Sequence, residues 1–316
     1  MKLSKTFTSM LPALAASTAV LLSSPAFAET YGFSQIGSES GWRTSETNSI
    51  KAEAEARGID LKFSDAQQRQ ENQIKAVRSF IAQGVDGILL APVVETGWDQ
   101  VLREAQRAEI PVVLIDRGVD ADPSLYLTKV ASDFTEEGAL AASWLAAETN
   151  GVCDIVELQG TVGSSAAIDR KTGFDSVISN FPNMNIIRSQ SGDFTRAGGK
   201  EVMESFLKAE GGGENICALF AHNDDMALGA IQAIKEAQLQ PAEDILVLSI
   251  DAVPDIFRAM ADGEANATIE LNPHLGGPAF DAIAAHEQGE EVDKWIKANG
   301  PLYLPDTAEE EYQARR

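Results

Sequence analysis

Short apolar runs alternate with longer stretches of helical period from residue 31 onward, and turn residues separate the two kinds of segment. Apolar runs of roughly four to eight residues are typical of buried strands, whereas apolar residues three or four positions apart are typical of helices. In the first half of the chain, the pattern predicts strands at residues 31–36, 61–64, 87–91, 112–115 and 125–131. Between them it predicts helices at residues 42–57, 70–83 and 98–108.

The same alternation restarts in the second half of the chain. Strands are predicted there at residues 154–158, 185–189, 218–221, 246–250 and 267–271. Helices are predicted at residues 166–180, 196–209, 225–237 and 254–261, followed by a helix at 278–287 and a short strand at 302–304. Strands joined by helical crossovers are typical of parallel sheets, so the predicted fold class is α/β with two similar doubly wound parallel-sheet lobes.

Right-handed crossovers and short connections favour the strand order 2-1-3-4-5 in each lobe. We expect the chain to pass between the lobes near Ala131, Glu270 and Leu302, which would join them by a multi-strand hinge. The first lobe is then predicted to comprise residues 29–131 plus 271–302. The second is predicted to comprise residues 132–270 plus 303–316.

The chain begins with the features of a secretory signal peptide. Lys2 and Lys5 give it a basic start, residues 10–22 form an apolar run, and a small-residue triplet, AFA, ends at Ala28. This arrangement predicts that residues 1–28 are removed and that the mature protein is periplasmic. A retained membrane anchor is the alternative, but Pro12 interrupts the run, which is shorter than the roughly 20 residues that span a bilayer.

Two cysteines in an exported chain permit one disulfide, between Cys153 and Cys217. In the favoured strand order, the first and third strands of the second lobe are neighbours, and each cysteine directly precedes one of them. We therefore expect the bond. From loop-closure entropy, it would stabilise the fold by about 4 kcal/mol for a loop of this length. Two buried free thiols are the alternative.

Acidic residues outnumber basic ones, with 48 Asp and Glu against 25 Lys and Arg and a formal net charge of −23 at pH 7. Such a surface repels nucleic acid and anionic lipid, and no basic run offsets it. We therefore expect no nucleic-acid partner and attribute the acidity to solubility.

Polar residues follow the predicted strands at the edge where open α/β sheets bind their ligands. Carboxylates such as Asp116 and Asp251 accept hydrogen bonds, Arg117 and Arg170 donate them in pairs, and Asn223 does both. This combination suits a neutral polyhydroxylated ligand, whose less polar face would lie on Trp42 or Phe194. The full set of strand-end segments is 37–43, 116–117, 159–170, 193–194, 222–225, 251, 270 and 272.

Each of these residues also has a purely structural interpretation. Asp116 beside Arg117 could form an ion pair in a turn, Asp193 could cap the helix that follows it, and Trp42 could belong to the core. Helix capping, however, requires neither arginine nor tryptophan. The presence of both at one edge of two lobes therefore favours a ligand site.

Five stretches are similar to the periplasmic galactofuranose-binding proteins, in the ribose- and galactose-binding cluster of ABC-importer receptors with the type I periplasmic binding protein fold. They are residues 32–43 (GFSQIGSESGWR), 71–78 (ENQIKAVR), 156–163 (VELQGTVG), 189–196 (SQSGDFTR) and 221–225 (AHNDD). The similarity spans nearly the whole mature chain. The segment from 288 to 316 matches less well, and two loops, after Arg117 and before Cys153, are slightly shorter.

The resemblance implies a set of ligand contacts that agrees with the strand-end segments. These contacts are Glu39, Ser40, Gly41, Trp42, Arg43, Asp116, Arg117, Arg170, Asn223 and Asp251. The broader family adds weaker candidates at Phe194 and Glu270. The implied partners are a monosaccharide, galactofuranose by resemblance, and the permease and ATPase of an ABC importer.

Two other classes of protein share this fold. An enzyme is disfavoured because the chain has three histidines and lacks the metal, phosphate-loop and nucleophile-elbow motifs. We also expect neither a metal nor a cofactor, since the contiguous residues 222–225 are poorly placed to converge on one ion. A sugar-responsive transcription regulator would carry a DNA-binding segment where the signal peptide lies.

We therefore expect the two lobes to close about the hinge on a monosaccharide, and the closed receptor to be the form that the permease recognises. Another pentose or hexose remains an alternative ligand, as does a role as the sugar-sensing partner of a chemoreceptor. Residue identities do not separate furanose from pyranose rings, because that choice depends on the shape of the pocket.

Overall fold

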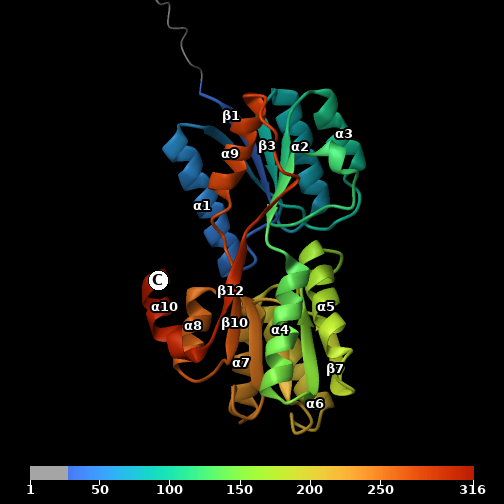
Figure 1. Ribbon diagram of the computed structural model, residues 1–316, viewed down its shortest axis with the longest axis vertical. Coiled ribbons are helices and arrows are strands. Elements are labelled where there is room, and N and C mark those ends of the chain that lie inside the picture. Colours follow the sequence, from blue (N-terminus) through green and yellow to red (C-terminus); the bar gives the residue numbers. More distant parts are fainter. Residues whose placement is uncertain (1–27) are drawn as a thin grey trace, which may run out of the picture.

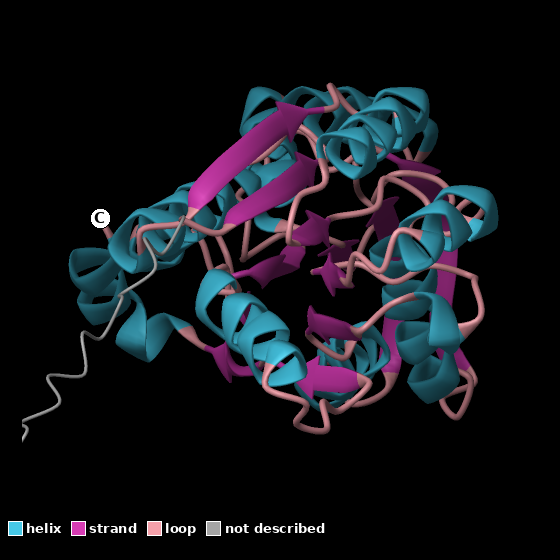
Figure 2. Ribbon diagram, turned by 90° about the horizontal axis from the view of Figure 1, so that it is seen from above, coloured by secondary structure: helices cyan, strands magenta, loops and turns pink. Residues whose placement is uncertain are grey.

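Two lobes, each built on one sheet with helices on both faces, make up the computed structural model, which describes residues 28–316 (Figures 1 and 2). The first lobe contains β1 (Thr30–Gln35), α1 (Gly41–Arg57), β2 (Asp60–Asp65), α2 (Gln70–Gln83), β3 (Gly87–Leu90), α3 (Asp99–Arg107), β4 (Val112–Ile115), β5 (Thr128–Ala131), α9 (Gly276–Glu287) and β11 (Trp295–Lys297). The second lobe contains α4 (Phe134–Glu148), β6 (Val152–Gln159), α5 (Ser165–Ile178), β7 (Asn183–Ser191), α6 (Arg196–Ala209), β8 (Ala218–Ala221), α7 (Asp224–Glu236), β9 (Leu246–Asp251), α8 (Pro254–Ala261), β10 (Ala267–Leu271), β12 (Asn299–Tyr303) and α10 (Ala308–Arg315).

The predicted strand order is confirmed in both sheets. The first sheet runs β11-β5-β4-β3-β1-β2 and the second runs β12-β10-β9-β8-β6-β7, so each contains the order 2-1-3-4-5 with one added edge strand. Strands β3 and β4 are buried along their whole length, as expected of central parallel strands covered by helices on both faces. The predicted ligand residues lie at the carboxyl ends of the strands in both lobes, and residues from both lobes line one cavity there.

The chain passes between the lobes after β5, after β10 and between β11 and β12 (Figure 1). The third passage corrects the boundary predicted at residue 302, because residues 299–303 already pair with β10 in the second sheet, Leu302 opposite Ile269. Sequence periodicity indicated only one short strand here, whereas β11 and β12 are two strands that belong to different sheets. Asn299 accepts a hydrogen bond from the backbone N–H of Asp133 at 2.8 Å, which ties two of the passages together.

Further elements differ from the sequence prediction, among them helix α10, which was not predicted. Helix α4 was not predicted, although Asp133 caps it by accepting from the N–H of Glu136. The strand predicted at 125–131 begins only at Thr128, because Asp122 and Pro123 start a 3-10 turn over Pro123–Leu125.

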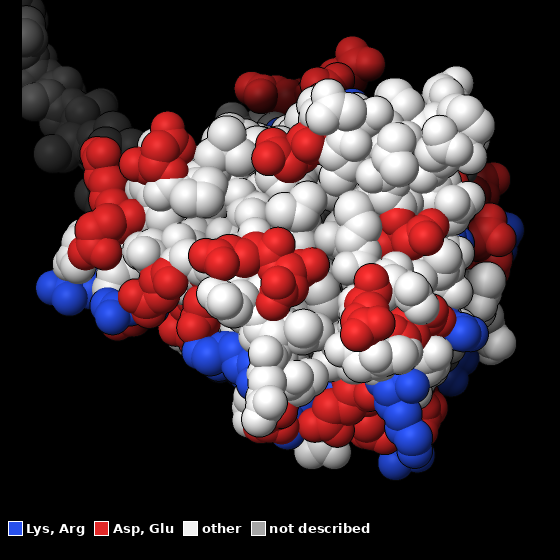
Figure 3. Space-filling model, turned by 90° about the horizontal axis from the view of Figure 1, so that it is seen from below, with Lys and Arg blue, Asp and Glu red and all other residues white. Residues whose placement is uncertain are grey.

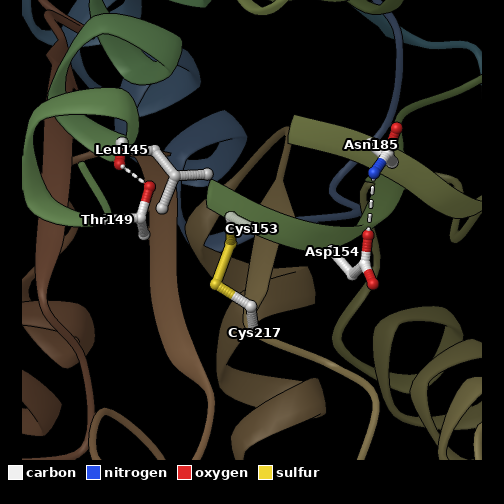
Figure 4. Close-up of a disulfide and its surroundings, with 6 residues drawn as sticks. All are labelled: Leu145, Thr149, Cys153, Asp154, Asn185 and Cys217. Carbon is white, nitrogen blue, oxygen red and sulfur yellow. Dashed lines mark hydrogen bonds between the residues drawn. A yellow bond between two sulfur atoms is a disulfide. The ribbon is translucent and has the colours of Figure 1, made fainter. Parts of the chain in front are cut away.

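The disulfide between Cys153 and Cys217 is confirmed, with 5.3 Å between the two Cα atoms (Figure 4). Cys153 lies near the start of β6 and Cys217 directly precedes β8, its neighbour in the sheet. The bond therefore joins the amino ends of two adjacent strands, at the edge of the sheet opposite to the predicted ligand residues.

The predicted signal peptide lies outside the described residues apart from Ala28. Among residues 28–316, none of the helices combines the length and apolar character needed to cross a membrane. Seen from the end of the second lobe, acidic side chains lie in several groups across the surface, and basic ones are fewer (Figure 3).

Candidate functional site

A cavity lies between the two lobes, at the carboxyl ends of their strands. Its lining contains three carboxylates and three arginines as well as two aromatic rings. The lining residues are Glu39, Ser40, Trp42, Arg43, Asp116, Arg117, Ala166, Arg170, Phe194, Asn223, Asp251 and Leu271.

Arg43 is fixed in the wall of the first lobe by three carboxylates. Its Nε donates to Glu39 at 3.1 Å, Nη1 donates to Glu46, and Nη2 donates to Asp116 at 2.7 Å. Arg43 and Glu46 lie three residues apart on α1, which places them on the same side of the helix. Burial raises the pKa of Glu46 to about 7 although Arg43 acts in the opposite direction. The guanidinium of Arg43 is therefore held in one orientation toward the cavity.

Asp116 and Arg117 follow β4 in a turn in which Asp116 has a φ of 62°. Arg117 donates from Nη1 to the carbonyl of Val93 at 3.2 Å, and its guanidinium lies 4.9 Å from the ring centre of Phe194. Because Phe194 belongs to the second lobe, this cation–π contact crosses the cleft. Burial lowers the pKa of Arg117 to about 10, so its side chain stays charged at neutral pH.

Arg170 occupies the corresponding position in the wall of the second lobe. Its Nε donates to Glu137 on α4 at 2.9 Å, and Nη1 donates to the carbonyl of His222. Helices α4 and α5 can approach closely because Gly138 on α4 and Gly173 on α5 each face the backbone of the other helix. A Cβ on Gly138 would lie 2.0 Å from the carbonyl oxygen of Arg170. These glycines therefore allow Glu137 to reach Arg170.

Asn223 and Asp251 complete the second-lobe wall. Asn223 caps α7 by accepting from the N–H of Met226 at 3.0 Å and donates to the carbonyl of Phe194 at 3.2 Å. Asp251 ends β9 with a φ of 129°, and its Oδ1 lies 3.8 Å from Nη2 of Arg170. Burial raises the pKa of Asp251 well above its ordinary value, and the charge of Arg170 opposes that effect.

Four polar atoms of these lining side chains are buried and have no hydrogen-bond partner. Two are acceptors, Oε2 of Glu39 and Oδ1 of Asp116, and two are donors, Nε of Arg117 and Nη2 of Arg170. Buried polar atoms are nearly always paired in folded proteins, so four such atoms around one cavity indicate a ligand with several hydroxyl-like groups.

Direct hydrogen bonds join the lobes around the cavity. The N–H of Gly41 donates to Asp225 at 2.8 Å, the N–H of Gly118 donates to Ser165 at 2.9 Å, and the N–H of Glu95 donates to the carbonyl of Gly163 at 2.9 Å. The lobes are therefore closed on each other in this conformation.

A family model for the periplasmic binding protein domain matches residues 31–291. This chain is a member of the periplasmic binding protein family. The resemblance and the type I fold predicted from the sequence are thereby confirmed.

Relatives of this periplasmic binding protein include proteins that are named for furanose sugars or were solved with furanose sugars bound. The galactofuranose-binding protein YtfQ of Escherichia coli is 62% identical over 91% of each chain. The binding protein of the arabinose ABC transporter of Shewanella sp. ANA-3, solved with α- and β-L-arabinofuranose, is 63% identical, has a TM-score of 0.89, and aligns over 91% of this chain and 95% of its own. A Mycobacterium smegmatis protein solved with β-D-fucofuranose is 48% identical, has a TM-score of 0.87, and aligns over 91% and 95%.

The cavity brings together most of the residues predicted as ligand contacts in this periplasmic binding protein. Two are placed differently: Gly41 is not part of the lining and uses its N–H for Asp225, and Glu270 lies outside the cavity, paired with Arg315 at 2.9 Å. The residues that do line it are Glu39, Ser40, Trp42, Arg43, Asp116, Arg117, Arg170, Asn223, Asp251 and Phe194.

Sequence reasoning missed the second layer of carboxylates behind the lining. The spacing of Glu46 from Arg43 on a predicted helix was a usable signal, because residues three apart lie on the same helix face. Glu137 gave no signal, since it lies 33 residues before Arg170 on a helix that was not predicted. Leu271 also lines the cavity without having been predicted, and Ala166 lies in the predicted strand-end segment 159–170 without having been named as a contact.

Proposed function

We propose that this chain is the receptor of an ABC sugar importer and binds one neutral monosaccharide in furanose form, galactofuranose or arabinofuranose, in the cavity between its closed lobes. The observation that carries the proposal is the set of unpaired atoms around the cavity, two acceptors and two donors. Sugar hydroxyls supply both a donor and an acceptor, so one molecule would satisfy all four. The furanose sugars in the names of the relatives support the choice of ring.

The charge of the cavity supports a neutral ligand. Its three arginines face three carboxylates in the lining, and two further carboxylates, Glu46 and Glu137, stand directly behind Arg43 and Arg170. No net positive charge is left for an anion. A sugar acid would therefore add an uncompensated negative charge to a buried site, which costs free energy.

The predicted partners are the permease and ATPase of the importer. Several hydrogen bonds join the lobes in this closed conformation, such as that from Gly41 to Asp225, and separation of the lobes would break them. A ligand that touches both walls would stabilise this closed form, since it has more contacts there than with open lobes. The closed form would then be the one that the permease recognises.

The test is isothermal titration of the mature protein with two sugars whose rings cannot open, 1,4-anhydro-D-galactitol (five-membered) and 1,5-anhydro-D-galactitol (six-membered). The five-membered ring should bind at least about tenfold more tightly, because the cavity shape sets the ring preference. D-Galacturonate serves as the anionic control: it should not bind in the same titration and should not weaken the binding of the five-membered ring. Failure of both rings, and of arabinose, ribose and galactose, to bind would remove the sugar assignment.

A further inference from the structure

The turn that follows β9 has a backbone conformation that non-glycine residues rarely adopt. Asp251 has a φ of 129° and Ala252 a φ of 58°. Side chains at positive φ are strained, so such a turn persists only where its surroundings hold it in place. Since Asp251 lines the cavity, the conformation of this turn determines where its carboxylate lies.

One buried carboxylate, that of Asp224, holds this turn. Its Oδ2 accepts from the N–H of Val253 at 2.8 Å, and its Oδ1 accepts from the hydroxyls of Ser249 and Thr268, the latter at 2.8 Å. The Thr268 hydroxyl in turn accepts from the N–H of Ala252 at 3.2 Å. Ser249 and Thr268 are partners in the β9–β10 pairing, so one register presents both hydroxyls to Asp224.

Asp224 does not line the cavity, and its side chain has no exposed surface. Placing a carboxyl group there is unfavourable, and burial raises its pKa to about 7. In an asparagine, an NH₂ group replaces one of the two acceptor oxygens. Either the N–H of Val253 then loses its acceptor, or the hydroxyls of Ser249 and Thr268 must turn round to accept, the latter while it also accepts from Ala252. The ionised carboxylate accepts at both oxygens and so holds the turn and both strands in the observed arrangement.

Asp224 also follows Asn223, another lining residue, in the first turn of α7. A negative charge in the first turn of a helix is favourable. The same residue thus connects the helix end that presents Asn223 with the turn that presents Asp251.

We propose that Asp224 is a positioning residue that acts through Asp251, holding the β9–α8 turn so that the Asp251 carboxylate stays in the cavity wall. This inference rests on the proposed sugar-binding function. Asp224 does not line the cavity, so it would affect the ligand only through the position of Asp251.

The test is a double-mutant cycle on sugar affinity, measured by titration with L-arabinose and 1,4-anhydro-D-galactitol. Asp224→Asn alone should weaken binding by about tenfold, whereas in an Asp251→Ala background it should change affinity less than about twofold. Such coupling separates positioning from general destabilisation, which would weaken binding equally in both backgrounds. Asp262→Asn is the control and should bind sugar like wild type, because Asp262 is an exposed acid of the same lobe that pairs with Arg258 and lies outside the lining.

A second pair of variants keeps the inference testable if Asp224→Asn does not fold. Thr268→Ser retains the hydroxyl that links Asp224 to Ala252 and should bind like wild type, whereas Thr268→Val removes it and should bind about fivefold or more weakly. Equal binding by these two variants would overturn the inference. So would wild-type affinity in folded Asp224→Asn, or an equal loss of affinity from Asp224→Asn in the Asp251→Ala background. Absence of sugar binding by the wild-type protein would instead refute the proposed function.

Discussion

The cavity combines a layer of lining residues with a layer of acids behind it. Glu46 stands behind Arg43, and Glu137 stands behind Arg170, at hydrogen-bonding distance in both cases. Buried ion pairs contribute little net stability because both groups lose their hydration. Their effect here is to fix the two arginines, and Nη2 of Arg170, in the cavity lining, has no hydrogen-bond partner.

Replacing Asp251 by Ala should weaken sugar binding by about 10- to 100-fold, because a hydrogen bond to a charged group contributes roughly 1.5–3 kcal/mol. The fold should remain nearly intact, since Asp251 ends a strand and makes only a 3.8 Å contact with Arg170. Isothermal titration of the folded variant is the measurement. Asp262→Ala, at an exposed pair with Arg258, is the control and should bind like wild type. Unchanged affinity of Asp251→Ala would contradict the site.

The buried acids should also give the protein a distinctive pH dependence. Burial raises the pKa of Glu46 from 4.5 to about 7 and that of Asp224 from 3.8 to about 7. In the unfolded chain these groups lose their protons at lower pH than in the folded protein. The stability that the two groups contribute is therefore fully present below pH about 4 and decreases as the pH rises toward 7.

The free energy of unfolding, from urea titrations at pH 5 and pH 7.5, should therefore be larger at pH 5. Glu46→Gln should reduce this difference, because it removes one of the buried acids whose pKa is raised. Glu104→Gln should leave it unchanged, since the hydrogen bond with Arg78 lowers the pKa of Glu104 and keeps its titration below this range. A wild-type protein more stable at pH 7.5 than at pH 5 would contradict this account.

At the scale of elements, the approach of α4 to α5 decides whether Glu137 reaches Arg170. Gly138 and Gly173 are the contact points, and either would meet a backbone oxygen at 2.0 Å if it carried a Cβ. Such close approach is a property of glycine alone, because every other residue would push the helices apart.

Gly138→Ala should reduce the free energy of unfolding by about 1–3 kcal/mol through overpacking and should also weaken sugar binding as Arg170 moves with α5. Gly277→Ala is the matched control, because it lies in helix α9 and a Cβ there would meet nothing closer than 3.9 Å. That substitution should be neutral or slightly stabilising. Urea denaturation and titration of both variants measure the two effects, and equal behaviour of the two would argue against the close-approach explanation.

At the scale of the whole molecule, the two sheets place structural and ligand-facing features at opposite edges. The disulfide joins the amino ends of β6 and β8, and the cavity lies at the carboxyl ends. The cross-link and the ligand site are therefore separated by the length of the strands.

Replacing both Cys153 and Cys217 by Ser should lower the free energy of unfolding by about 4 kcal/mol, from the loop-entropy estimate for a separation of 64 residues. Sugar affinity should be unchanged, because the bond is remote from the cavity. Denaturant titration without reductant and calorimetry are the measurements, and wild-type protein in dithiothreitol should behave like the variant. A loss of affinity in the folded variant would show that the bond also shapes the site.

Sequence alone determined the parts of this protein that follow from local pattern and general topology. The apolar runs and crossovers implied the strand order. That order implied that Cys153 and Cys217 are neighbours and that Asp116, Asn223 and Asp251 lie at strand ends facing a common cleft. These conclusions need no knowledge of distant contacts, because parallel strands align their carboxyl ends whatever their spacing in the chain.

Only the tertiary structure decided which distant residues meet. Glu137 and Asp224 were not predicted to act behind the cavity, since their partners lie on other elements at separations that carry no periodic signal. For the same reason Glu270, at a strand end like Asp251, turned out to pair with Arg315, and the third passage between the lobes lies before Asn299. Contacts between elements depend on packing in three dimensions, which a one-dimensional pattern does not specify.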